Sequence, residues 1–131
     1  MNRLRACISS IQTHEKVSRV CLNYQNQKLN AITLELPSFV RQNAEVFVCF
    51  KETEVGVAKG SCEHISFSNL FEGKIESIQK GVILSSIKVM HHSHQLTSII
   101  TTAALERLHL SIGDSVILFV KATELSLEEI G

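Results

Sequence analysis

Two short segments of this chain carry side chains that could bind an anion. Lys51-Glu52-Thr53-Glu54 and Lys121-Ala122-Thr123-Glu124 both read Lys-x-Thr-Glu. A lysine ammonium group supplies positive charge and a threonine hydroxyl supplies a hydrogen-bond donor, so each segment suits a small anion. A single lysine at a strand end is usually a solvated charge, but the recurrence of the same order favours a binding role.

Three histidines offer a different chemistry. His91, His92 and His94 could bind a transition metal, because imidazole suits Zn, Ni and Cu ions. They fall on an expected hairpin turn, however, and no Cys or His spacing completes a metal site. We therefore predict an exposed loop and keep a metal site in the His91–His94 loop as an alternative. The chain has no Gly-x-Ser-x-Gly segment and no other recognisable catalytic motif, so it is not expected to be an enzyme.

The two Lys-x-Thr-Glu segments belong to an internal repeat. Positions 67 residues apart (69 − 2) match in the pairs Asn2 and Asn69, Ile8 and Ile75, Ser10 and Ser77, Ile11 and Ile78, Gln12 and Gln79, Leu29 and Leu96, and Ile32 and Ile99. Apolar residues that recur at the same offset over so many positions predict a duplicated structural unit. A repeat of this size is near the limit for an independent core, so the repeats should pack against each other or against other subunits.

Composition excludes several classes of protein. Lys plus Arg and Asp plus Glu number 13 each, so no basic excess predicts nucleic-acid binding. No apolar run approaches the ~20 residues of a membrane span, and the N-terminal segment lacks a signal-peptide core. The 4 cysteines form no Cys-x-x-Cys pair. These features predict a cytoplasmic protein with reduced thiols.

Near-strict alternation of apolar and polar residues predicts strands in both repeats. A short helix is expected at 103–108, capped by Thr102, and its counterpart at 36–41 has Pro37 in the first turn. Fourth strands are expected at 44–51 and 115–121, and short fifth strands at 53–57 and 123–127. This order predicts an all-β fold of two tandem OB-like five-stranded β-barrels, each with one short helix. The predicted units are residues 1–58 and 68–131, joined by a linker at 59–67.

Four segments in fixed order resemble the molbindin family of molybdate-binding (Mop, or TOBE-type) domains. They are Ser66–Ile75, Leu96–Thr101, Leu110–Val116 and Val120–Leu125. The second repeat matches the family pattern nearly throughout and the first matches more loosely. The resemblance implies a protein that binds molybdate or tungstate as an oxyanion, without transforming it, for intracellular storage, buffering or sensing.

The resemblance also implies a set of site residues. In the family, a Ser-x-Arg-Asn segment and a Lys-Ala-Ser/Thr segment from different units enclose the anion at an interface. Transferred to this sequence, the site comprises Ser66, Ser68, Asn69, Lys121, Ala122 and Thr123, with Ser98 as a weaker candidate. The first repeat contributes Lys51 and Thr53. Ser68 stands where the family commonly has arginine, and Arg3 is a candidate to replace that charge.

The departures from the family pattern leave a second function open. Glu52 replaces the alanine of the motif and places a carboxylate near the expected dianion, so we expect sites of unequal quality. The alternative function is a regulatory or interaction domain of a molybdate importer ATPase or molybdate-responsive regulator, with a weakened oxyanion site. A homo-oligomer is expected in either case, with a trimer preferred over a dimer, and with neither membrane nor nucleic acid as a direct partner.

Overall fold

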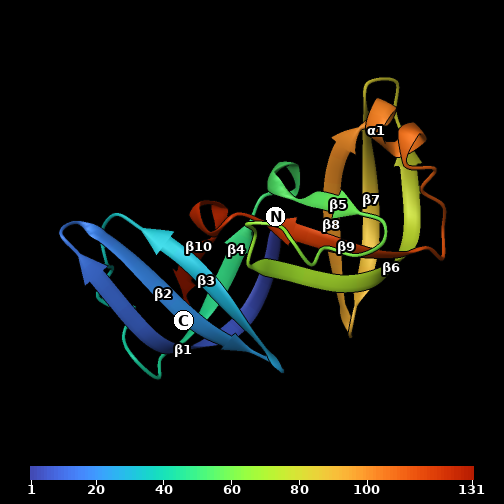
Figure 1. The fold of residues 1–131 in the computed structure, drawn as a ribbon. Helices are drawn as coiled ribbons and strands as arrows, with labels where there is room; N and C mark the ends of the chain where they lie inside the picture. The colour runs from blue at the N-terminus through green and yellow to red at the C-terminus, as the bar shows by residue number, and fades with distance from the viewer.

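The chain folds mostly into β-structure, arranged as two five-stranded antiparallel sheets (Figure 1). The computed structural model describes residues 1–131. The first repeat forms β1 (Asn2–His14), β2 (Val17–Tyr24), β3 (Gln27–Thr33), β4 (Glu45–Phe50), the 3₁₀ turn η1 (Glu52–Glu54) and β5 (Gly56–Ala58). The second repeat forms β6 (Asn69–Lys80), β7 (Leu84–His91), β8 (His94–Thr101), α1 (Thr102–Arg107), β9 (Ser115–Val120), η2 (Ala122–Glu124) and β10 (Ser126–Glu129).

The two repeats exchange their last strands. The first sheet has the order β10-β4-β1-β2-β3, and the second sheet has the order β5-β9-β6-β7-β8. Leu127 of β10 pairs with Val48 of β4, and Val57 of β5 pairs with Leu118 of β9. Each sheet is therefore completed by a strand from the other repeat, so the sheets do not follow the predicted division into residues 1–58 and 68–131.

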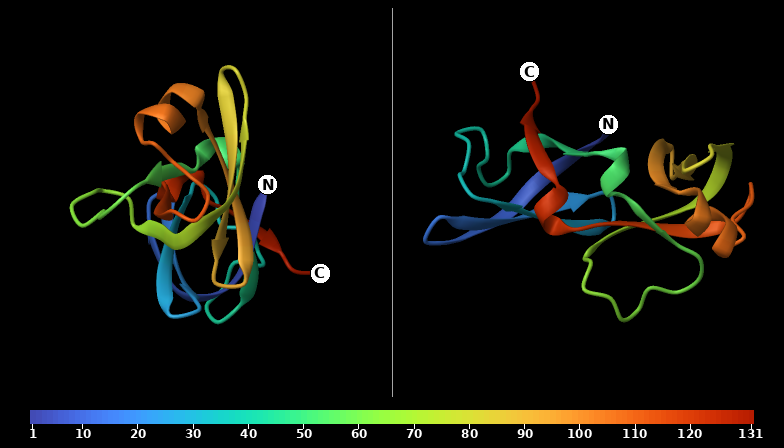
Figure 2. Two further views of the ribbon diagram at one scale, coloured as in Figure 1. Left: turned by 90° about the vertical axis from the view of Figure 1, so that its right-hand side faces the viewer. Right: turned by 90° about the horizontal axis from the view of Figure 1, so that it is seen from above.

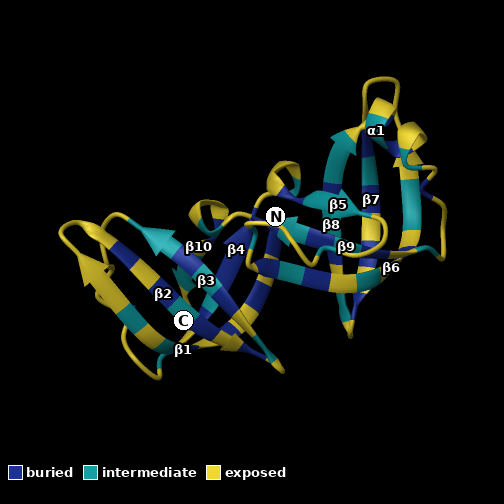
Figure 3. Cartoon of the chain, in the orientation of Figure 1, coloured by how far each residue is buried: buried dark blue, intermediate teal, exposed yellow.

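The two sheets lie side by side along the molecule, and residues 59–68 loop out between them (Figure 2). Their buried residues form one continuous apolar cluster. Phe50 of β4 stacks on Phe71 of β6 with ring centroids 5.5 Å apart. Buried and exposed residues alternate along β2 and β7, as period-two sequences require (Figure 3). The repeats thus share a core, which confirms the expectation that they pack against each other.

The prediction of one helix in each repeat is wrong for the first repeat. There, residues 36–41 form only a turn, closed by the Val40 N–H donating to the Pro37 carbonyl (3.0 Å). Proline disfavours the helical conformation at the residue before it, and this short segment has no alanine, whereas residues 103 and 104 are both alanines. The helix of the second repeat is present, but its N-cap is Thr101, whose hydroxyl accepts from the Ala104 N–H (3.1 Å).

The predicted fifth strands also begin later than expected. The Lys-x-Thr-Glu segments form the 3₁₀ turns η1 and η2, and the strands start at Gly56 and Ser126. Each turn is closed by the Glu N–H donating to the Lys carbonyl, at 3.0 Å for Glu54 and Lys51 and 2.9 Å for Glu124 and Lys121. The chain therefore changes direction at these motifs, where it leaves one sheet and enters the other.

Candidate functional site

The two Lys-x-Thr-Glu turns meet where the sheets join. The turn η1 packs against β8 of the second sheet, and η2 packs against β3 of the first sheet. A small hollow of about 170 Å³ lies between them. Its lining consists of Met1, Phe50, Lys51, Glu54, Thr123, Glu124, Leu125 and Ser126. The lysine of the first repeat therefore shares a hollow with the threonine of the second.

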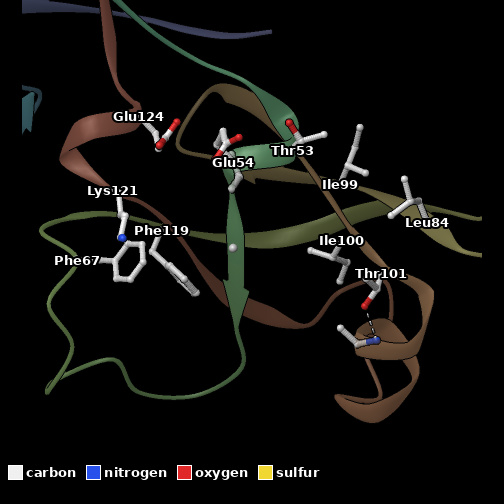
Figure 4. A pocket seen from close by; sticks show the side chains of 13 residues that line it. Thr53, Glu54, Phe67, Leu84, Ile99, Ile100, Thr101, Phe119, Lys121 and Glu124 are labelled. Carbon is white, nitrogen blue, oxygen red and sulfur yellow. Dashed lines mark hydrogen bonds between the residues drawn. The ribbon is translucent and has the colours of Figure 1, made fainter. Parts of the chain in front are cut away.

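A larger groove carries the opposite pairing, with Lys121 of the second repeat and Thr53 of the first (Figure 4). It has a volume of about 700 Å³ and follows the gap between the edge strands β5 and β8. Most of its wall is apolar. The apolar side chains include Phe67, Leu84, Ile99, Ile100 and Phe119. In Figure 4, Lys121 lies near Phe67 and Phe119 at one side of the groove.

Acidic side chains also face these hollows. Glu54 and Glu124 line both of them, so each lysine has carboxylates in its surroundings. Glu52, the departure from the family motif, lines neither. Its carboxylate instead accepts a hydrogen bond from the Met1 ammonium group (2.7 Å). This bond is the main reason why the pKa of Glu52 is lowered from its ordinary value.

Two of the predicted site residues use their side chains elsewhere. Asn69 is fully buried, and its amide group donates to the carbonyls of Asn30 (3.0 Å) and Val120 (3.2 Å). Ser98 is also fully buried, and its hydroxyl donates to the carbonyl of Val55 (2.7 Å). Both side chains therefore have their donors in use within the single chain.

The remaining predicted residues are on the surface. Ser66 and Ser68 are exposed and lie in the segment just before β6, on either side of Phe67. Only Phe67 of this segment lines the larger groove. Arg3 lies on β1 and pairs with Glu128 of β10 (3.1 Å), and it lines neither hollow. The structure of the single chain thus brings together the lysines and threonines but not the serines or Arg3.

The sequence interpretation missed Phe119 and Ser126. Phe119 lies on β9, two residues before Lys121, which directly follows that strand. Both line the larger groove, and this spacing could have revealed Phe119. Ser126 lines the smaller hollow and is the counterpart of Gly56, at an offset of 70 (126 − 56). Nothing in its local sequence distinguishes it from other surface serines.

The three histidines of the loop differ in burial: His91 is buried, His92 is exposed and His94 is half-buried. No group of three or more His, Cys, Asp or Glu side chains converges as a metal site would require. The prediction of an exposed loop holds for His92, which is exposed, but is wrong for His91, which is only 1% exposed. The sequence alternation places His91 on the core side of β7, next to residues of the other repeat.

The comparisons with known proteins agree with the resemblance read from the sequence. Residues 65–127, which span the second repeat, match the family model of the TOBE domain. The whole chain shares its fold with the cytoplasmic molybdate-binding protein ModG, solved with molybdate bound. The TM-score is 0.91 at 21% sequence identity, over 98% of this chain and 96% of that chain. No curated protein sequence matches the chain.

None of the helical segments has the length and apolar character needed to cross a membrane.

Proposed function

We propose that this protein binds molybdate in the cytoplasm and holds it without transforming it, for storage, buffering or sensing. The observation that carries the proposal is the pairing of Lys51 with Thr123 in one hollow and of Lys121 with Thr53 in another. The TOBE match and the fold shared with the molybdate-binding protein ModG support this ligand.

Each hollow offers groups that suit a tetrahedral dianion. The lysine ammonium groups supply charge, and the threonine hydroxyls donate hydrogen bonds. The first amides of a 3₁₀ turn have no partner within the turn, so the N–H groups of Ala122 and Thr123 add donors. Tungstate has the same charge and shape, so we propose that it binds at the same place.

Second copies of the chain would complete the sites. Ser66 and Ser68 are exposed beside the larger groove, where their hydroxyls can reach an anion held against another subunit. The groove wall around Phe67 and Phe119 is apolar and open, as expected for a surface that a partner covers. We propose a homo-oligomer, with a trimer of two-repeat chains as the first choice and a dimer as the second.

One observation favours the alternative function, a regulatory or interaction domain with a weakened oxyanion site. Glu54 and Glu124 line both hollows. Two unit charges of like sign about 4 Å apart repel by ~4 kcal/mol at an effective dielectric constant of ~20. These carboxylates would therefore oppose a dianion unless water or the lysines screen them.

Calorimetric titration of the full chain with molybdate, tungstate, sulfate and phosphate tests the proposal. We expect tight binding of the first two anions and weak or no binding of the others. Equal and weak heats for all four anions would contradict molybdate binding and favour the alternative function. Light scattering on the same samples gives the oligomeric state.

A further inference from the structure

We infer that neutral His91 stabilises the contact between the two repeats, and that protonation of its imidazole ring weakens the junction of the two sheets. This inference does not depend on which anion the protein binds.

His91 and Tyr24 are equivalent residues that meet across the junction. Tyr24 ends β2 and His91 ends β7, at the repeat offset of 67 (91 − 24). Their rings stack with centroids 5.8 Å apart and planes inclined by 27°. Phe71 meets both rings edge-on, at 6.1 Å from Tyr24 and 5.4 Å from His91. The imidazole therefore forms part of the contact that holds the two sheets together.

The hydrogen bonds of His91 define its neutral state. Nδ1 lies 2.6 Å from the carbonyl oxygen of Glu72, which can only accept, so Nδ1 carries the hydrogen. In the neutral ring Nε2 is then an unprotonated acceptor. Nε2 of His91 and the hydroxyl of Tyr24 are both buried without a hydrogen-bond partner. A proton on Nε2 would place a charge and an unpaired N–H among aromatic rings.

Two of the three neighbouring titratable groups that act on the pKa of His91 lower it, as burial of the ring does. Burial is the main cause that lowers the pKa of His91, and His92 and His94 lower it further when they are charged. The rings of His91 and His92 have centroids 4.3 Å apart. From the other packed elements, Tyr24 of β2 is uncharged, and Glu72 of β6 raises the pKa through its carbonyl and its carboxylate.

The sign of the pH effect follows from these contacts. While the two sheets are in contact, the pKa of His91 is lower than its ordinary value of 6.5. When the sheets separate, the exposed ring regains its ordinary pKa, so the separated form takes up the proton first. The junction therefore has its full stability above about pH 6.5 and loses stability as the pH falls below that value. Acidification should open the contact between the sheets before it unfolds either sheet.

Two amides report the junction directly. The Asn30 N–H donates to the side chain of Asn69, and the Thr97 N–H donates to the side chain of Asn2, each at 2.8 Å. The amides of Ile8 and Ile75 serve as controls, because they donate to the carbonyls of Ala44 (2.9 Å) and Asp114 (3.0 Å) within their own repeats. Hydrogen exchange of the full chain is measured by NMR and corrected for the intrinsic rate. It distinguishes opening of the junction from unfolding of either sheet.

Between about pH 7.5 and about pH 5.5, the range in which histidine titrates, protection at the two junction amides should fall several-fold more than at the two controls. His91→Gln keeps a neutral donor for the Glu72 carbonyl and should remove this difference. His92→Gln should retain it, because His92 is exposed. The inference would be overturned if, in the wild type, protection at the two junction amides did not change with pH. The same holds if it changed only together with protection at the two controls.

The imidazole signals of the wild-type protein provide a second measurement that needs no variant. The imidazole ring of His91 should stay neutral below its ordinary pKa of 6.5. Titration of His91 at or above its ordinary pKa would overturn the inference even if His91→Gln failed to fold.

Discussion

Asn69 and Asn30 are joined by a reciprocal pair of hydrogen bonds across the junction of the two sheets. The side chain of Asn69 donates to the Asn30 carbonyl (3.0 Å) and accepts from the Asn30 N–H (2.8 Å). Asn2 makes the same pair with the backbone of Thr97, at 2.8 Å for both bonds. An asparagine amide has the donor and acceptor of a peptide group, so each Asn continues the strand pairing from one repeat to the other.

Replacing Asn69 with alanine should destabilise the fold. The change removes three hydrogen bonds at a fully buried position and leaves backbone groups of Asn30 and Val120 without those partners. We expect a loss of about 2–3 kcal/mol in the free energy of unfolding, measured with urea. Asn26→Ala is the matched control, because Asn26 is exposed in a turn and should change stability little. Equal effects of the two variants would contradict this role.

Replacing both Glu54 and Glu124 with glutamine should strengthen molybdate binding. Both carboxylates line the hollows that contain the lysines, and glutamine keeps their size while removing their charge. Both side chains are exposed, so we expect ~1 kcal/mol, or a several-fold lower Kd, at low salt and a smaller gain at high salt. Calorimetry at two ionic strengths measures the change. Weaker binding by the double variant would show that these carboxylates assist the site.

Replacing Phe67 with serine should weaken the assembly of the chain rather than its fold. Phe67 is only partly buried, packs edge-on against Phe119 at 4.9 Å between centroids, and belongs to the apolar wall of the larger groove. We therefore expect a shift toward smaller species in light scattering, with little change in the urea midpoint. An unchanged oligomer together with a lower midpoint would mean that this residue serves the single chain alone.

The sequence predicts the repeat and most strands because the alternation at positions such as Val20–Leu22 and Ile87–Val89 is nearly strict. It does not predict the exchange of β5 and β10, because strand order depends on long-range pairing that local patterns do not encode. It also misplaces the fifth strands, since the 3₁₀ turns that follow Lys51 and Lys121 are three residues long and too short to show a periodicity of their own.

The candidate site is predictable only in part for a related physical reason. Lys51, Thr53, Lys121 and Thr123 recur in both repeats, and the structure places them at shared hollows. Asn69 is also a repeated residue, but its repetition reflects the junction of the sheets. Recurrence alone cannot distinguish a residue that binds a ligand from one that holds the repeats together. In a molecule of two equivalent repeats, both kinds of residue occur twice.

The central claim is that the two Lys-x-Thr-Glu turns bind the oxyanion, and the most direct test is a molybdate titration of Lys51→Ala, Lys121→Ala and the double variant. Both lysines are exposed, so the fold should persist, and Lys88→Ala provides a control with an exposed lysine outside both hollows. We predict that each single variant binds more weakly, that the double variant shows no measurable binding, and that Lys88→Ala binds like the wild type. Wild-type affinity in the double variant would contradict the account.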